Sequence, residues 1–400
     1  MNVSAPINEA ISEVDLLITQ QGNDLSEMLN EHRLEMFPPN AQKSLRPFQL
    51  SEAAGFLGVT AGYLKNLSLE GKGPQPKLTP SGRRPYAAEQ LIEMRRLLDQ
   101  NSRAGTRYVP HRRGTEHLQV IATVNFKGGS AKTTTTAHLA QYLALKGHRV
   151  LAIDLDPQAS LSALHGFQPE IDQNDSLYEA LRYDDDRKPL SALVKSTNFP
   201  GLDIVPASLE LQEFEYDTPL ALAQKDGSMG QIFFARLDHV LAEVADNYDV
   251  VVIDCPPQLG YLTLTALSSA TGILITVHPQ MLDVMSMSQF LLMLGDVMGT
   301  LKRAGANMQL DWLRYLVTRY EPTDGPQNQM TAFMRSLFTQ HVLVNPMLKS
   351  TAISDAGITK QTLYEVERSQ FTRATYDRAL ESLNAVNAEI ADLIHRAWGR

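Results

Sequence analysis

The sequence predicts an α/β fold in which a mostly parallel sheet is covered by helices on both faces and is preceded by a small winged helix-turn-helix domain. Three observations predict this fold. From residue 116 onward, apolar strand candidates alternate with helical segments, an order that gives a parallel sheet. The first of these strands runs into a glycine loop followed by a helix. Upstream, residues 46–100 hold two short helical segments around Gly58 and a basic stretch rich in Pro and Gly.

Composition limits the class of protein. The 400 residues suggest two or three domains. The formal net charge is −9, yet residues 41–113 hold thirteen Lys or Arg against five acids, so this module should have a polyanionic partner. The single cysteine, Cys255, excludes a disulfide framework and a cysteine-built metal cluster within one chain. We see no run of membrane-span length and no signal pattern, and therefore expect a cytoplasmic protein.

Residues 1–40 are expected to form an N-terminal helical segment. Ile11, Val14, Leu17 and Ile18 recur at helical spacing, and the segment holds seven acids against one arginine. It is too short to form a core of its own. Its apolar stripe should pack on a partner chain, which would make it a dimerisation element, or on the next module. A loosely ordered leader is the alternative.

Residues 41–100 are expected to form the winged helix-turn-helix domain. Ser51 can cap its first helix and Thr60 its second. The exposed face of the second helix, which would enter a major groove, would then present Tyr63, Lys65 and Asn66. The bland alternative is a small helical domain with a solvated basic face.

The wing is expected in the Pro- and Gly-rich residues 71–86. Arg83 and Arg84 follow Gly82 at its tip, where they can reach phosphates or a minor groove. A further helix should cover residues 87–98. Residues 101–115 read as a polar, basic linker, and the nucleotide domain should extend over residues 116–400.

The second domain should contain six buried strands with helices between them. The strand candidates are residues 118–124, 149–153, 202–205, 250–253, 272–277 and 313–318. The main helical segments are residues 133–146, 231–245, 286–305 and 374–398.

The glycine loop after the first strand has the order of a phosphate-binding loop: strand, glycines, Lys-Thr, helix. Glycines let several backbone N–H groups point into one concavity, and the helix directs its positive end there. Lys132 can then reach the β- and γ-phosphates, and Thr133 can hold Mg²⁺. The usual pattern fails at two glycine positions, which are Phe126 and Ala131 here. What stands instead is the "deviant" loop, with a second lysine, Lys127, directly before the glycines.

Two later strands end in acids. Asp154 and Asp156 follow one strand and Asp254 ends another, so all three should lie at the carboxyl edge of the sheet beside the loop. Phosphoryl transfer requires acids that hold Mg²⁺ and orient the attacking water.

These motifs resemble a known family. Residues 127–134, the Asp-x-Asp-Pro-Gln of residues 154–158 and the Asp-x-Pro-Pro of residues 254–257 are similar to those of ParA-type plasmid partition ATPases of the deviant Walker A class. The front module makes the chain similar to the larger members, with the RepA proteins of repABC plasmids nearest. Leu348 stands where the family has a proline.

The resemblance implies a set of roles. ATP would join two subunits face to face. Lys127 would be the signature lysine that reaches the partner's phosphates, and Lys132 would bind the phosphates of its own subunit. Asp156 would orient the water, and Thr133, Asp154 and Asp254 would serve Mg²⁺. The nucleotide-binding residues would be Lys127, Gly128, Gly129, Ser130, Ala131, Lys132, Thr133, Thr134, Thr318 and Arg319.

The resemblance also implies partners: a second copy in a homodimer, nucleoid DNA bound without sequence preference, operator DNA at the front module, and a centromere-binding ParB-type protein. Lys349 carries over as a DNA contact. Further candidates for non-specific contacts are Lys302, Arg303, Arg335, Lys360 and Arg373.

Three rival functions share parts of this pattern. A nitrogenase-type iron protein needs cysteine ligands that this chain lacks, and a MinD-type membrane ATPase needs a basic C-terminal helix, whereas residues 387–400 carry balanced charge. A nucleotide-responsive transcriptional repressor without a partition role remains the alternative.

Overall fold

The computed structural model describes residues 14–36, 43–79, 82–102, 106–167, 175–223, 233–306 and 308–400. The chain divides into two compact units, Met1–Lys43 and Ser44–Arg400. The first contributes one helix, α1 (Val14–Met36), on which the side chains of Val14, Ile18 and Met28 are exposed. The helical reading of this segment is therefore confirmed over Val14–Met36, while Ile11 and residues 37–40 lie outside the described residues.

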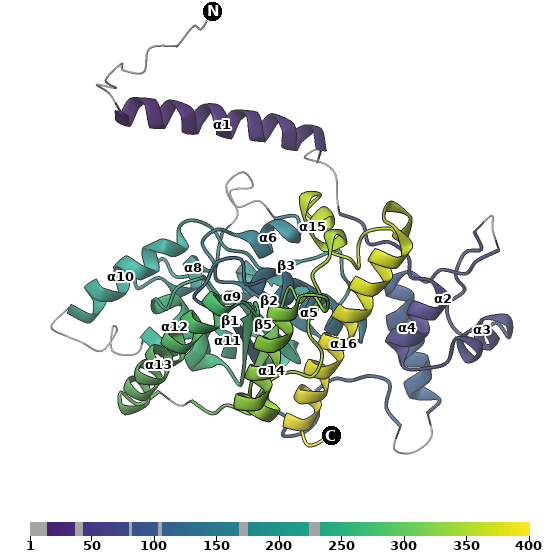
Figure 1. The fold of residues 1–400 in the computed structure, drawn as a ribbon. Coiled ribbons are helices and arrows are strands. Elements are labelled where there is room, and N and C mark those ends of the chain that lie inside the picture. The colour runs from purple at the N-terminus through teal and green to yellow at the C-terminus, as the bar shows by residue number, and fades with distance from the viewer. Residues whose placement is uncertain are drawn as a thin grey trace, which may run out of the picture. The chain divides into compact units, whose positions relative to one another are not determined.

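A seven-stranded sheet forms the centre of the second unit (Figure 1). Its strand order is β3-β4-β2-β5-β1-β6-β7, and each pair of neighbours is parallel except β3 and β4. The strand that leads into the glycine loop, β1, thus lies between β5 and β6. The strands are β1 (Gln119–Val124), β2 (Val150–Asp154), β3 (Lys195–Ser196), β4 (Leu202–Val205), β5 (Val250–Asp254), β6 (Gly272–Val277) and β7 (Trp312–Val317).

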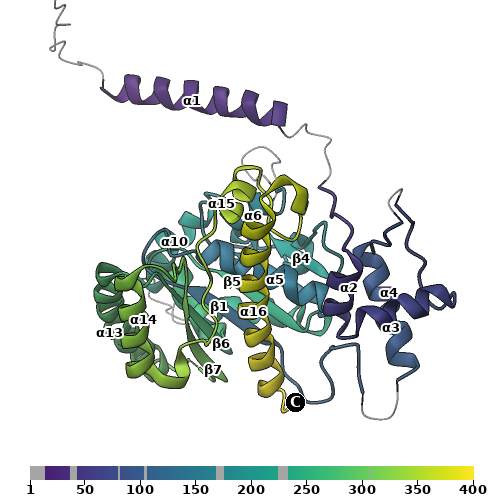
Figure 2. The ribbon, with the colours of Figure 1, turned by 45° about the vertical axis from the view of Figure 1, so that its right-hand side comes forward.

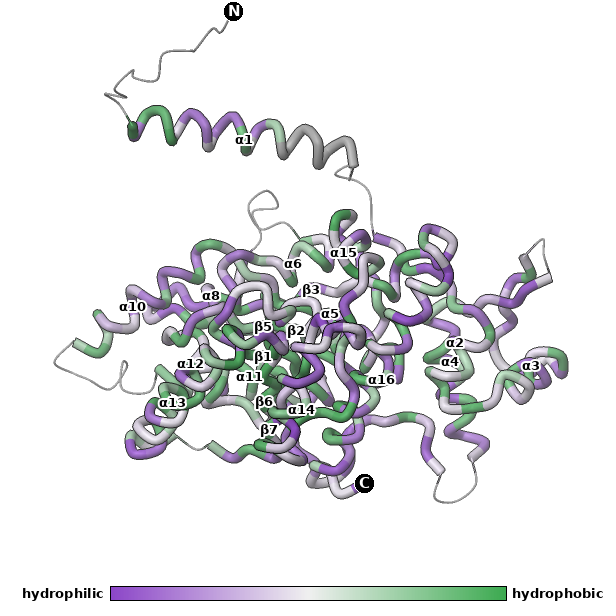
Figure 3. The backbone as a smooth tube through the Cα atoms, viewed as in Figure 1, coloured by the Kyte–Doolittle hydropathy of each residue, from purple (hydrophilic) through white to green (hydrophobic). Residues whose placement is uncertain are grey.

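Helices cover both faces of this sheet, as predicted. Alternate strand residues enter two different cores: Ile121 and Val252 pack with one helical layer, and Val120 and Val251 with the other. Figure 3 shows the apolar character of the central strands. The first layer comprises α5 (Lys132–Leu145), α6 (Ser160–Leu164), α15 (Thr351–Ile358) and α16 (Arg373–Ala397). The second comprises α8 (Tyr178–Leu181), α9 (Leu190–Leu193), α10 (Leu211–Ala223), α11 (Arg236–Ala242), α12 (Tyr261–Ser269), α13 (Met281–Arg303) and α14 (Gly325–Phe338).

The six predicted strands are present, each within one residue of its expected bounds. Three details differ. The short strand β3 was not predicted, and α13 begins five residues before the expected Ser286. The long helix expected over residues 231–245 is instead α11, flanked by the 3₁₀ turns η1 (Phe233–Ala235) and η2 (Ala245–Asn247). Two further 3₁₀ turns are η3 (Thr339–His341) and η4 (Arg368–Gln370).

The expectation that no segment reaches the length of a membrane span was wrong. Among the described residues, one helix, α13, is long and apolar enough to cross a membrane by length and composition alone. This is weak support for a span, because helices of soluble proteins pass the same test. Met287, Phe290 and Leu294 of α13 are buried in the core of the second layer.

The front module contains three helices, α2 (Leu50–Leu57), α3 (Ala61–Leu69) and α4 (Ala88–Gln100). As predicted, the Thr60 hydroxyl caps α3 by accepting a hydrogen bond from the Tyr63 N–H at 3.2 Å. The prediction that Ser51 caps α2 was wrong. The helix begins two residues earlier than this cap implies, after Gln49, and the Glu52 carboxylate accepts from the Gln49 N–H at 2.9 Å.

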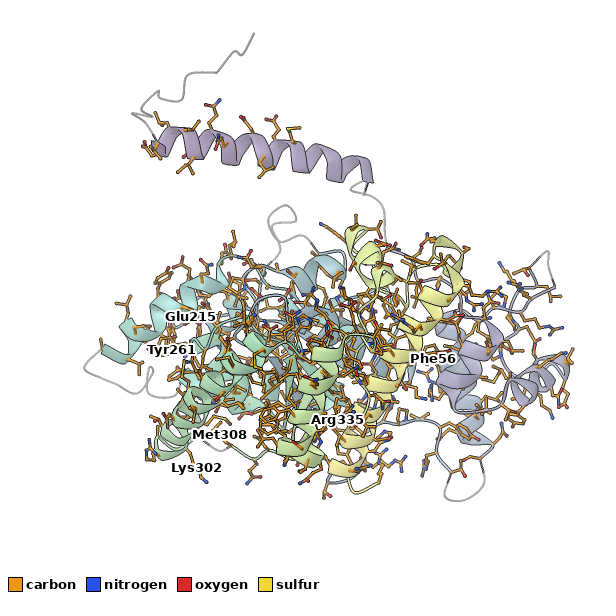
Figure 4. All side chains as sticks on the ribbon, in the orientation of Figure 1. Phe56, Glu215, Tyr261, Lys302, Met308 and Arg335 are labelled. Atoms are coloured by element: carbon orange, nitrogen blue, oxygen red, sulfur yellow. The ribbon has the colours of Figure 1, made fainter. Side chains whose placement is uncertain are left out.

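The front module packs directly on the helical layer that contains α5 and α16 (Figure 2). Phe56 lies edge-on to Tyr142 of α5 and to Tyr364, and Figure 4 labels it at this junction. Arg95 of α4 is buried and donates to three carbonyls: Tyr108 O at 3.0 Å, Phe56 O at 2.8 Å and Leu145 O at 3.2 Å. Burial lowers the pKa of Arg95 to about 10. One guanidinium therefore joins α2, α4, the following segment and the C-terminal end of α5.

Replacing this guanidinium should loosen the junction. Arg95→Met keeps most of the side-chain volume but leaves three buried carbonyls without their donor, so the free energy of unfolding should fall by about 1–3 kcal/mol. Urea denaturation would measure it. Arg96→Met is the matched control, because Arg96 is the exposed neighbour on α4 and should change stability by less than about 0.5 kcal/mol. Equal stability of the two variants would contradict the role assigned to Arg95.

Candidate functional site

The glycine loop connects β1 to α5 through two residues with left-handed backbone conformation. Gly129 has φ 75°, which glycine adopts freely, but Ala131 has φ 67° and carries a Cβ. An L-residue with a Cβ pays about 1–2 kcal/mol for this conformation. Ala131 is the residue before α5 and gives that helix no side-chain cap. The first N–H groups of α5 are therefore available to an anion in the loop.

Side chains from β6 and β7 hold the loop in place. Asn125 donates to Thr276 O, and the Thr276 and Ser130 hydroxyls lie 3.1 Å apart. The Thr318 hydroxyl donates to Ser130 O at 3.0 Å, and Arg319 donates to Gly129 O at 3.2 Å. Thr318 and Arg319 were predicted to lie at the nucleotide, and the structure brings both to the loop.

The two lysines of the loop lie in different environments. Lys132 is buried, and its ammonium lies 3.4 Å from Lys127 O inside the loop. Burial lowers the pKa of Lys132, while Asp254 and Asp156 act in the opposite direction. The Lys127 side chain is 46% exposed and forms an ion pair with Asp283 at the start of α13. Only Lys132 is therefore directed into the loop's own concavity.

The two strand-end acids Asp154 and Asp254 lie side by side. They occupy paired positions on the neighbouring strands β2 and β5, and both are fully buried. Asp154 accepts from the Ser162 N–H at 2.8 Å and from its hydroxyl at 2.7 Å. Burial and the nearby charge of Asp156 raise the pKa of Asp154 to about 7. Burial and the Asp154 charge raise the pKa of Asp254 well above its ordinary value.

This arrangement fits a cation. Among the described residues, Asp254 Oδ2 and the neighbouring Thr123 hydroxyl are buried without a hydrogen-bond partner, which is a costly arrangement unless something else satisfies them. Thr133, at the start of α5, also contacts Asp254. No cluster of three His, Cys, Asp or Glu side chains occurs in the described part of the chain. Two carboxylates and a hydroxyl, completed by phosphate oxygens and water, suit Mg²⁺.

The remaining predicted residues of the nucleotide site have separate places. Asp156 is partly exposed beyond β2, and its carboxylate accepts from the Gln158 N–H at 3.0 Å. Thr134 lies in the first turn of α5, where its carbonyl is 2.7 Å from His138 Nδ1. Gly128 and Gly129 line a cavity of about 280 Å³ beside the loop, together with Lys127 and Arg319. The chain therefore brings all the predicted nucleotide residues to one edge of the sheet.

The predicted DNA contacts are exposed to different degrees. Tyr63, Lys65 and Asn66 are exposed on α3 as predicted, and Arg83 is exposed in the segment predicted to form the wing. Arg84 is partly buried and donates to the Ser68 hydroxyl at 2.8 Å.

On the sheet-containing part of the chain, Lys349 forms an ion pair with Glu321 at 2.7 Å. Arg335 donates to Val344 O at 2.8 Å. Figure 4 labels Arg335 and Lys302 on α14 and α13. Of the six candidates, Lys302 and Arg303 lie on α13, Arg335 on α14 and Arg373 at the start of α16, whereas Lys349 and Lys360 lie outside helices.

Sequence reasoning missed three supporting residues. Asn125 accepts from the Lys127 N–H at 2.9 Å and so shapes the start of the loop. Ser162 fixes Asp154, and Asp283 pairs with Lys127. Asn125 stands within the loop motif and could have been found there. Ser162 and Asp283 lie eight and 156 residues from their partners, and only the folded chain brings them together.

Comparisons with known proteins identify the relatives of this chain. The AAA domain pattern matches residues 118–307. A protein of Sinorhizobium fredii provisionally named replication protein A is 66% identical over 96% of this chain and 95% of its own length. Protein SopA of Escherichia coli is 30% identical over 90% of this chain and 92% of its own length.

Solved structures share the fold. One described as a partition protein has a TM-score of 0.61 over 96% of this chain and 99% of its own, at 17% identity. The cobyrinic acid a,c-diamide synthase of Mycobacterium smegmatis, solved with an ATP analogue and magnesium, has a TM-score of 0.50 at 30% identity, over 61% of this chain and 91% of its own. With two relatives matched along almost their whole lengths and the deviant loop in place, this chain belongs to the ParA family of partition ATPases, near its replication protein A members.

Proposed function

We propose that this chain is a DNA-partition ATPase. It binds ATP with Mg²⁺, forms a sandwich dimer around the nucleotides, binds nucleoid DNA without sequence preference and segregates a plasmid together with a centromere-binding ParB-type protein. The observation that carries the proposal is the division of labour between the two lysines. Lys132 is buried and serves the loop's own phosphates, whereas Lys127 is half exposed and free of that task. A second lysine that does not bind the phosphates of its own subunit is available to the nucleotide of a partner subunit.

The chemistry of hydrolysis follows from the same residues. The loop N–H groups and Lys132 bind the phosphates, and Thr133, Asp154 and Asp254 hold the cation. Magnesium, when bound, neutralises charge on the β- and γ-phosphates. Asp156, partly exposed next to this site, orients the attacking water. The ATP analogue and magnesium in the cobyrinic acid a,c-diamide synthase support this choice of ligands.

The front module supports a second role, repression of the chain's own operon. Tyr63, Lys65 and Asn66 are exposed together on α3, and the module packs through Arg95 on the far end of the helix that begins at the phosphate loop. A repressor that uses nucleotide only as a ligand would have the same front module but would need no signature lysine. The proposed protein combines both roles and is located in the cytoplasm on the nucleoid.

Two sets of substitutions separate these roles. Lys132→Gln should lower ATP hydrolysis at least about a hundredfold, because it removes the charge that stabilises the transferring phosphate. Arg83→Ala with Arg84→Ala should leave hydrolysis unchanged and weaken binding to promoter DNA of the chain's own gene, with Arg83 contributing most since Arg84 is held by Ser68. Phosphate release and fluorescence anisotropy would measure the two activities.

Partition itself is tested by the hydrolysis rate of the wild type. The rate should be low for the protein alone. It should rise clearly when both duplex DNA and the ParB-type protein are present. Lys302→Ala with Arg303→Ala is a charge-matched control for the wing variant. It should spare the preference for promoter DNA over other duplex DNA, even though both residues are candidates for non-specific contacts. A wild type that binds promoter DNA but never hydrolyses ATP under any of these conditions would favour the repressor alternative.

Magnesium binding should depend on pH. A carboxyl with a raised pKa is protonated at acid pH, so Mg²⁺ must displace a proton from Asp154 below about pH 7. The pKa of Asp254 is raised as well, by burial and by the Asp154 charge, so its protonation opposes Mg²⁺ binding in the same direction. The affinity for Mg²⁺ in the presence of ADP should therefore rise about tenfold from pH 6 to pH 8, as one proton with a pKa near 7 requires. Calorimetry would measure it, after correction for Mg²⁺ binding to free ADP.

The raised pKa values also predict a pH dependence of stability that can be measured without metal. Because the pKa of Asp154 is higher in the folded than in the unfolded chain, the contribution of Asp154 to the free energy of unfolding should decrease as pH rises from about 4 to about 7. Asp154→Asn cannot titrate and should flatten both profiles. Mg²⁺ affinity independent of pH in the wild type would show that these carboxyls are not the ligands.

Ala131 can be tested by restoring glycine. Ala131→Gly relieves a left-handed backbone strain of about 1–2 kcal/mol and adds flexibility of about 0.5–1 kcal/mol to the unfolded chain, for a net gain of roughly 0.5 kcal/mol. It also removes a Cβ beside the phosphates, so the affinity for ADP should rise a few-fold. Ala159→Gly is the matched control, since Ala159 has φ 53° but lies outside the loop. Equal effects of both variants on ADP affinity would contradict this account.

A further inference from the structure

The start of α13 makes an unexpected contact with the phosphate loop. Asp283 lies in the first turn of that helix, and its carboxylate forms an ion pair with the Lys127 ammonium. The same carboxylate lies 3.3 Å from His278 Nδ1. The Asp283 side chain is 10% exposed and the Lys127 side chain 46% exposed. The acid is thus fixed by its surroundings, while the lysine is the movable member of the pair.

The pair spans a cavity of about 280 Å³ beside the loop. Gly128, Gly129 and Arg319 line it on the loop side, and His278 and Asp283 on the α13 side. Lys127 extends across this space toward α13 rather than into the concavity that holds Lys132. In this conformation the Lys127 ammonium is engaged within its own subunit.

We propose that Asp283 is an intramolecular latch for Lys127. It holds the ammonium in the nucleotide-free subunit and competes for it with the phosphates bound by a partner subunit. An ammonium held against Asp283 on its own subunit cannot at the same time extend to phosphates bound by a partner subunit, so each dimer that forms must first break the pair. This inference rests on the proposed function, in which Lys127 acts on the partner's nucleotide.

A simpler role for Asp283 must be distinguished. An acid in the first turn of a helix stabilises that helix through its dipole, whatever lies opposite. Loss of this interaction would lower the stability of the protein but would leave the reactivity of Lys127 unchanged. The reactivity of the Lys127 amine is therefore the measurement that separates the two roles.

The first experiment labels lysines in the nucleotide-free, full-length protein. Brief acetylation followed by mass spectrometry gives the modification rate of each lysine. Asp283→Asn removes the charge but keeps the size of the side chain, and it should raise the rate at Lys127 about threefold or more. Asp296→Asn removes the same charge from an exposed position on the same helix and should leave Lys127 at its wild-type rate. Exposed Lys302 serves as the internal reference in all three proteins.

The second experiment measures dimerisation by sedimentation with a non-hydrolysable ATP analogue and Mg²⁺. Asp283→Asn should lower the protein concentration at half-dimerisation about three- to tenfold, the range of a partly exposed ion pair. In a Lys127→Gln background, the same substitution should have no effect, because the latch then has nothing to hold.

The outcomes are separable. Unchanged Lys127 labelling in Asp283→Asn overturns the latch, even if the wild type dimerises normally. Faster labelling with unchanged dimerisation overturns the competition between carboxylate and phosphate. A wild type that binds the analogue but stays monomeric overturns the proposed function, and the competition falls with it.

Discussion

The conformation of the phosphate loop depends on hydrogen bonds from residues outside the loop. A loop with two residues in left-handed conformation would not keep one shape by its own hydrogen bonds. Here its carbonyls at Gly129 and Ser130 accept from Arg319 and Thr318 at the end of β7, and its Ser130 hydroxyl meets Thr276 of β6. The strand order β5-β1-β6-β7 is what places those donors beside the loop. The sheet thereby provides both the position and the conformation of the anion site.

The same sheet creates an electrostatic conflict next to the loop. Parallel pairing of β2 with β5 puts Asp154 beside Asp254 in a fully buried place, where two negative charges repel each other and neither is solvated. Protons or a divalent cation can resolve this conflict. The fold therefore holds two carboxylates in an unfavourable arrangement. Binding of a cation relieves this repulsion and is favoured for that reason.

The structural elements that could be predicted from the sequence are those marked by a local residue pattern. Apolar runs bounded by Gly, Pro or charge located the six main strands, and the lysine–glycine pattern located the loop. Errors arose where the chain has no such signal. Ser51 is a preferred cap by residue type, yet the helix begins after Gln49, where the Glu52 carboxylate accepts from the Gln49 N–H. The start of α13 is rich in Met and carries no clear cap. The contact of Asp283 with Lys127 and the bond of Arg84 to Ser68 depend on residues brought together only by folding, so periodicity and spacing cannot reveal them.

Helix α5 fixes the distance between the phosphate loop and the front module. Its 14 residues span about 21 Å, with the phosphate loop at one end and the Arg95 guanidinium bound to its last turn at the other. Inserting a single residue would lengthen it by about 1.5 Å and rotate one end by about 100° relative to the other. Both attachments could not then be satisfied together. The length of this helix is consequently fixed by two sites that share no residue, and the spacing between the loop and the front module cannot drift as their surfaces change.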